Sequence, residues 1–188
     1  MYKRQGVALY DVSGDEAIQT GEFPVPIGEA FGLSGTDATL YTAAARAKTA
    51  EIIQNIGNEA AASDTMLILP TVSVYGEYDG EDGEKHYICG YGMWLYYDLG
   101  AGLSDPRAPV YSGSGSGGSI ACITLAADGS IAEVRETYDG ADNTERLKEI
   151  CGPLTDLAAK LNSGDAEARR LVPTGNELLT MYLNYYFF

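Results

Sequence analysis

The chain is poor in the residues that hold metals or act as nucleophiles. It has one histidine, His86, and three cysteines, Cys89, Cys122 and Cys151, among 188 residues. These four residues lack the close spacing of zinc ligands and would come from separate elements, so buried, unreactive thiols are the expected state. In an oxidising compartment, Cys89 and Cys122 could pair, because they lie on neighbouring expected strands, and Cys151 would remain unpaired. We expect no metal site and no bound cofactor.

Positive charge is also scarce, since 12 Lys and Arg residues stand against 27 Asp and Glu residues, for a net charge of −15. Nucleic acids and anionic membranes require clustered cations, and only residues 3–4 and 169–170 place two basic side chains together. No apolar run approaches the roughly 20 residues of a membrane span. We therefore expect neither nucleic acid nor a membrane span among the partners.

The beginning of the sequence lacks the apolar segment of a signal peptide, because residues 1–4 lead directly into Gly6 and Val7. Two interpretations stay open: a cytoplasmic protein with Met1 as its native start, or an exported protein whose leader was removed and replaced by Met1. Abundant Gly, Ser, Thr and Tyr with few Lys favours the cell envelope or the extracellular space.

The clearest pattern in the chain is a pair of long strands over residues 65–78 and 86–99, joined by an acidic turn. Apolar side chains alternate with period two along both strands, which is typical of a strand with one buried face. The register that puts both apolar faces on one side pairs Val74 with Tyr91 and Val72 with Met93.

The opposite face of this hairpin is the candidate ligand-binding surface. The same register places Tyr75 opposite Gly90, and the glycines at positions 90 and 92 leave a notch that permits strong curvature. The candidate binding residues on this curved face are Tyr75, Gly90, Gly92, Trp94 and Tyr96. The alternative is that a helix or loop packs over the same face.

The remaining patterns predict an α+β fold: a long N-terminal helix packed on a curved four-stranded antiparallel meander, followed by C-terminal helices. Asp128-Gly129 is a strong signal for a second hairpin, and residues 1–35 are expected to form an extended arm ahead of a single domain at 36–188. The expected elements are a helix over residues 36–57, strands over 65–78, 86–99, 119–126 and 131–138, and helices within 142–185.

Two local patterns resemble ligand-binding motifs but lack the neighbouring elements or the ligand spacing that those motifs require. The tract at residues 113–118 satisfies G-x-G-x-x-G, but a strand follows it instead of the helix that a dinucleotide site needs. We expect the loop at 100–118 to be a flexible connector, with a lid as the alternative. The acidic turns at 79–84 and 139–142 lack the ligand spacing of a calcium loop and are expected to be solvated.

The C-terminal residues 181–188 are nearly all apolar or aromatic, whereas chain ends are commonly polar. We expect them to dock against the core of the domain. The alternative is a homodimer contact through these C-terminal aromatics.

The order of elements and the bend at Gly90 and Gly92 resemble the cystatin-like and NTF2-like α+β shape over roughly residues 38–138. The stretches at 97–100, 138–142 and 150–154 are similar to uncharacterised exported or lipoprotein-type domains of Gram-positive gut bacteria.

NTF2-like enzymes usually place a His or Asp at the mouth of a sheet-lined pocket, so the resemblance points to His86, Asp98 and, less directly, Glu77. His86 and Asp98 are the candidate acid or base residues. The simplest interpretation of His86, which lies beside the acidic turn, is nevertheless a solvated side chain. No Cys–His pair is visible, because Cys89 lies three positions from His86 and therefore on the opposite face of the strand.

Three functions remain open at this point. The first is a non-enzymatic envelope or extracellular binding domain whose aromatic sheet face holds a small molecule, glycan or peptide. The second is an NTF2-like enzyme with a sheet-lined pocket. The third is a structural homodimer module. We expect the first, and hence a protein that is not an enzyme.

Overall fold

The computed structural model describes residues 6–11, 18–56, 66–98, 110–115, 119–137, 143–173 and 176–187, and it is an α+β protein. The strands are β1 (Gly6–Asp11), β2 (Ile18–Pro24), β3 (Met66–Asp79), β4 (Lys85–Asp98), β5 (Val110–Gly115), β6 (Ser119–Leu125), β7 (Ile131–Glu136) and β8 (Arg169–Arg170). The helices are η1 (Gly28–Phe31), α1 (Gly35–Ile56), η2 (Glu81–Gly83), α3 (Asn143–Cys151), α4 (Thr155–Ser163) and α5 (Asn176–Phe187).

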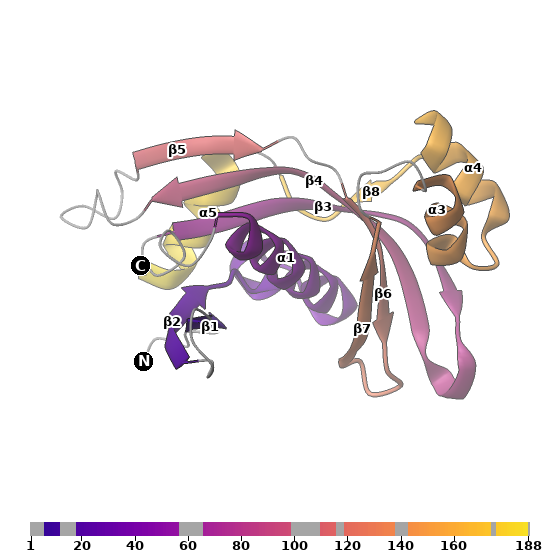
Figure 1. Ribbon diagram of the computed structural model, residues 1–188, viewed down its shortest axis with the longest axis horizontal. Coiled ribbons are helices and arrows are strands. Elements are labelled where there is room, and N and C mark those ends of the chain that lie inside the picture. The colour runs from indigo at the N-terminus through magenta and orange to yellow at the C-terminus, as the bar shows by residue number, and fades with distance from the viewer. Residues whose placement is uncertain are drawn as a thin grey trace.

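The main sheet is antiparallel, with six strands in the order β7-β6-β4-β3-β8 and with β5 paired to the second half of β4. The first two strands, β1 and β2, form a separate two-stranded sheet. Figure 1 shows that β3 and β4 bend strongly along their length, with α1 inside the bend and with α3 and α4 outside it. We call these two sides the inner face and the outer face.

The expected simple meander of four strands is not matched, because β5 and β8 extend it. Its four strands do lie side by side as β3, β4, β6 and β7. The sequence missed β5 because its Gly-Ser composition is typical of a flexible connector, and part of the loop expected at 100–118 is this strand. It missed β8 because two residues, Arg169 and Arg170, carry no periodicity.

The register of the long hairpin differs from the expected one by two residues in its middle and by one residue at both ends. Val74 pairs with Cys89 and Val72 with Tyr91, between two irregularities, one after Pro70 and one after Val74. The first adds a residue on β4 and the second adds one on β3, so the two shifts cancel and the ends of the hairpin share one register. Such bulges increase local twist, which fits the bend of both strands here (Figure 1).

Each face of the sheet carries its own hydrophobic core. On β4, Tyr87, Cys89 and Tyr91 pack in the inner core with α1, whereas Ile88 packs in the outer core. The outer core comprises Ile88, Cys122, Ile150, Cys151 and Ala158. The disulfide considered between Cys89 and Cys122 is therefore wrong, because the two thiols lie on opposite faces, and all three cysteines are free.

The inner core joins the long helix to the last helix of the chain. The Phe31 ring lies 4.7 Å from the Tyr41 ring of α1 and 6.4 Å from the Tyr182 ring of α5. The Tyr41 hydroxyl donates a hydrogen bond of 3.0 Å to the carbonyl oxygen of Pro70 on β3. Leu178, Leu179, Tyr182 and Leu183 are buried, so α5 docks against the core. Within the expected segment 181–188 this holds for Tyr182 and Leu183, whereas Tyr185 is half-exposed and the side chains of 186–188 lie outside the described residues.

Candidate functional site

Four neighbouring strands bring one side chain each into a row across the outer face, near the turn between β3 and β4. His86 on β4 pairs with Tyr78 on β3 and with Thr124 on β6, and Thr124 pairs with Glu133 on β7. In the next row, Cys122 on β6 pairs with Arg135 on β7. With Glu84, which precedes β4, we call these seven residues the histidine cluster: Tyr78, Glu84, His86, Cys122, Thr124, Glu133 and Arg135.

The imidazole of His86 is enclosed by its neighbours. Its ring stacks on the Tyr78 ring at 4.6 Å and 20°, and its Nδ1 lies 2.9 Å from Thr124 Oγ1, within hydrogen-bond distance. The backbone of Gly80 approaches the ring so closely that a Cβ at this position would overlap Nε2. The His86 side chain is only 15% exposed, so the expected solvated histidine is wrong.

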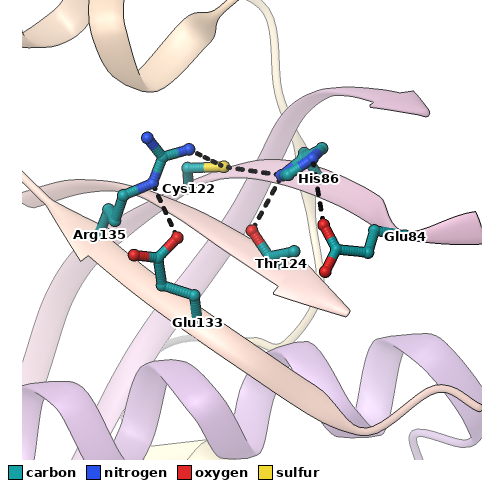
Figure 2. Close-up of polar contacts among 6 residues, drawn as sticks. All are labelled: Glu84, His86, Cys122, Thr124, Glu133 and Arg135. Atoms are coloured by element: carbon teal, nitrogen blue, oxygen red, sulfur yellow. Dashed lines mark hydrogen bonds and ion pairs between the residues drawn. The ribbon is translucent and has the colours of Figure 1, made fainter. Parts of the chain in front are cut away.

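Cys122 lies between the imidazole and a guanidinium, as Figure 2 shows. Its Sγ is 3.8 Å from His86 Nδ1, and Arg135 Nη2 donates to it at 3.8 Å. Burial raises the pKa of Tyr78, and the neighbouring Cys122 raises it further, while Arg135 opposes both effects. The Cys122 side chain is fully buried.

The charged members of the cluster are the part that reaches solvent. The Arg135 side chain is 42% exposed, and its Nε lies 3.2 Å from Glu133 Oε2. Glu84 is partly exposed, and its Oε2 lies 4.0 Å from His86 Nε2. Burial lowers the pKa of Arg135, but Cys122 and Glu133 together raise that pKa above its usual value, so the guanidinium remains charged. The cluster thus presents a cation and two carboxylates around a half-buried aromatic stack.

A thiol beside an imidazole is also the arrangement of a cysteine nucleophile. Such a nucleophile must be reachable by substrate, but the sulfur of Cys122 has no exposed surface. The imidazole nitrogen that faces it is shared with Thr124. In this conformation, the contact between Cys122 and His86 contributes to packing and polar satisfaction and presents no reactive group.

The candidate binding surface from the sequence lies farther along the same hairpin. The Tyr75 ring covers Gly90, where an added Cβ would lie 2.6 Å from Tyr75 Cε2, although the residue paired with Gly90 is Ser73. Gly90 is buried and Tyr75 packs against the outer core. The Thr71 hydroxyl fills the space over Gly92. Side chains therefore occupy the positions where Cβ atoms would lie at both glycines, although Gly92 itself is exposed.

Four further candidates are placed as follows. Trp94, Tyr96 and Asp98 belong to β4, but their side chains lie outside the described residues. Glu77 on β3 is exposed. The structure therefore brings His86 together with residues that the sequence did not place beside it, above all Cys122 and Arg135.

The sequence offered one weak signal for that grouping. His86 and Cys122 both lie on expected strands, 36 positions apart in the sequence. Their contact depends on the register of β4 with β6. This register is defined by the pairs Cys89–Ala121 and Ile88–Cys122. Alternation fixes which side chains share a face of one strand, but not this register.

Within the described residues, no group of three or more His, Cys, Asp or Glu side chains is placed to hold a metal ion. The helices of those same residues include none with the length and apolar character needed to cross a membrane. The chain matches no protein-family model, no curated protein and no solved structure, so the histidine cluster has to be interpreted from its own geometry.

Proposed function

We propose that this chain is a non-enzymatic binding domain that holds a small molecule, glycan or peptide on the outer face of its curved sheet, at the histidine cluster. The observation that supports this most directly is the partly exposed Arg135 guanidinium beside the stacked Tyr78 and His86 rings. A guanidinium binds carboxylates and vicinal oxygens through two parallel hydrogen bonds, and aromatic rings favour sugar and peptide side chains.

The strand geometry supports a preorganised site. His86 and Thr124 lie on paired strands in the middle of the sheet, and sites built on strands are positioned more precisely than sites on loops. Gly152, at a φ of +53°, lies against the Tyr78 hydroxyl, where an added Cβ would be 2.8 Å away. The turn between α3 and α4 therefore holds one wall of the proposed site in place.

The test uses the fact that His86 is the only histidine in the chain, so its ring signals in an NMR spectrum are unambiguous. Labelled protein would be titrated with panels of glycans, short peptides and small carboxylic acids, at a protein concentration at which the chain is monomeric. At least one ligand class should shift the His86 signals in a saturable manner. Ligands that leave these signals unchanged while shifting those of other residues would contradict the proposed site.

A matched pair of variants sharpens the experiment. Arg135→Gln removes the guanidinium of the cluster, and Arg170→Gln removes an exposed guanidinium on β8, on the far side of β3 from the cluster. We expect ligand affinity to fall roughly tenfold or more for the first variant, as for the loss of a charge-assisted hydrogen bond, and to be unchanged for the second. Equal effects would indicate general electrostatic attraction.

An enzyme is the second candidate, because Cys122 Sγ lies 3.8 Å from the imidazole of His86. This alternative needs a conformation that exposes the sulfur. Rapid alkylation of Cys122 in the folded protein, lost in His86→Asn, would favour the enzyme over the binding domain.

The other parts of the proposal concern shape, assembly and location. The placement of α1 inside a bent antiparallel sheet supports a cystatin-like or NTF2-like shape.

The half-exposed Tyr185 on α5 supports a homodimer through the C-terminal aromatics as a third candidate function. The resemblance of residues 97–100, 138–142 and 150–154 to exported domains supports the cell envelope or the extracellular space, which fractionation of the source cells would test.

A further inference from the structure

The strand β7 ends the described sheet, and it pairs with β6 alone among the described strands. The Thr137 amide donates to the carbonyl of Ile120 at 2.8 Å, just after β7. Along a strand of an antiparallel pair, successive residues point their backbone N–H and C=O groups alternately toward the partner strand and away from it. Arg135 and Glu133 therefore also point their backbone groups toward β6. Val134 and Glu136 then turn their backbone groups away from the sheet. The hydrogen bond from Arg146 Nε to the Glu136 carbonyl, at 3.0 Å, agrees with this direction.

The side chains of β7 are complementary to a second copy of the same strand. Glu133 and Arg135 flank Val134 at equal distances, and both lie on the outer face, partly exposed. If two copies pair antiparallel with Val134 opposite Val134, each Glu133 lies opposite the partner's Arg135. Opposite charges that face each other across two strands stabilise the pair, and like charges destabilise it.

The charges also select one register. A slip by two residues keeps the hydrogen-bonding pattern but changes which side chains face each other. In one direction it places Arg135 opposite the partner's Arg135, and in the other it places Glu133 opposite the partner's Glu133. Charged residues on an edge strand usually oppose edge pairing. Here the pattern opposes the slipped registers and favours the one centred on Val134, where the outward backbone groups of both copies form a hydrogen-bonded pair.

We propose that two copies of this chain associate antiparallel through β7, with a twofold axis at Val134 that joins their sheets into one. The interface is isologous, so both copies use the same outward edge and it closes as a dimer. In this register the Glu136 carbonyl faces the partner's Ala132 amide and accepts from it beside Arg146 or in its place. The axis stands perpendicular to the sheet, which keeps the histidine clusters of both copies on the same outer face. This inference is independent of the ligand-binding proposal, because it rests on the backbone edge and the charges alone.

The test is a charge-reversal experiment with two variants. Glu133→Arg leaves two arginines at positions 133 and 135, and Arg135→Glu leaves two glutamates there. Each variant alone should remain monomeric, because like charges then oppose each other in the proposed register. An equimolar mixture should form a 1:1 heterodimer, since every cross-strand pair is again of opposite sign. Sedimentation velocity would measure all three samples beside the wild type.

The expected result is a wild-type dimer, at least a tenfold weaker self-association for each variant, and recovery of the dimer in the mixture. Wild type that stays monomeric at the highest soluble concentration, or a dimer that neither variant weakens, would overturn the proposal. A measurement on the wild type keeps the test independent of variant folding. The Val134 amide should become more protected from hydrogen exchange as protein concentration rises, while the Ile123 amide on β6 should not change.

Discussion

Arg169 binds Asp37 through two parallel hydrogen bonds, from Nη1 to Oδ2 at 2.7 Å and from Nη2 to Oδ1 at 2.9 Å. The contact connects β8 to the first turn of α1, across 132 positions of sequence. Arg169 also pairs with Val74 on β3. One arginine thus links the long helix to the far edge of the sheet.

We expect this ion pair to stabilise the fold fully above about pH 4 and progressively less as the pH falls below that value. The hydrogen bonds from Arg169 hold the pKa of Asp37 below its usual value, against the opposing effect of burial. A carboxylate with a lowered pKa contributes stability above its unfolded pKa and loses it as pH falls through its folded pKa. Asp37→Asn should therefore reduce the unfolding free energy at pH 7 by about 1 kcal/mol or less, because the pair is partly exposed.

Urea unfolding at neutral pH and near pH 2 checks this dependence. The difference between wild type and Asp37→Asn should shrink at the acidic pH, where the wild-type carboxyl becomes protonated. The exposed Asp156 in the first turn of α4 supplies the control variant Asp156→Asn. A difference for Asp37→Asn that is the same at both pH values would contradict the explanation.

The thiols should be unreactive in the folded protein at pH 8. Burial, and then the neighbouring Cys122, raises the pKa of Cys89 to about 12 and that of Cys151 to about 11, so both remain protonated. Cys122 has no exposed surface. We expect an aromatic disulfide reagent to titrate none of the three thiols quickly before unfolding, and all three after unfolding without reductant. Fewer than three after unfolding would indicate a disulfide.

Gly28→Ala should destabilise the protein strongly. A Cβ at this position would overlap the Ala38 Cα and lie 2.6 Å from the Ala38 carbonyl oxygen, so the backbone of η1 or α1 would have to move. Overpacking of this kind costs about 1–3 kcal/mol, and we expect the upper end of that range. Gly90→Ala is the comparison, because there the obstacle is the movable Tyr75 ring, and thermal unfolding should show a smaller loss.

Replacing Tyr182 by alanine should reduce the unfolding free energy by about 3–5 kcal/mol, as for other buried aromatic residues. Its ring is buried in the inner core beside Phe31. Tyr185→Ala, at a half-exposed position of the same helix, should have a smaller effect. If the Tyr185→Ala variant instead lost stability in a concentration-dependent manner, the C-terminal helix would belong to a dimer interface.

Thr124→Val should cost about 1–3 kcal/mol, because it leaves the enclosed Nδ1 of His86 without the hydroxyl that lies 2.9 Å away. The replacement keeps the shape of the side chain, so the loss would report on the polar contact. Denaturant unfolding measures the cost, and the His86 ring signals should shift as well. Thr39→Val on α1, whose hydroxyl donates to the carbonyl of Gly35 in an exposed turn, is the control.

Local periodicity in the sequence determined most of the elements. Alternating apolar residues predicted β3 and β4 to within a few positions, the Asp128-Gly129 turn predicted the hairpin of β6 and β7, and the helix expected over residues 36–57 is α1. The buried residues of α5 were likewise indicated by the apolar C-terminal sequence. These predictions succeed because an apolar face has to be buried, whatever it packs against.

Only the tertiary structure decided the register of the strands and therefore the candidate site. Two cancelling bulges place Val74 opposite Cys89, and the pairing of β4 with β6 brings Cys122 beside His86. The Gly-Ser segment of β5 and the two arginines of β8 became strands because a neighbouring strand offered them hydrogen bonds. Such contacts join residues that are distant in sequence, so the free energy that selects them comes from the packed sheet as a whole and leaves no periodic pattern in the chain.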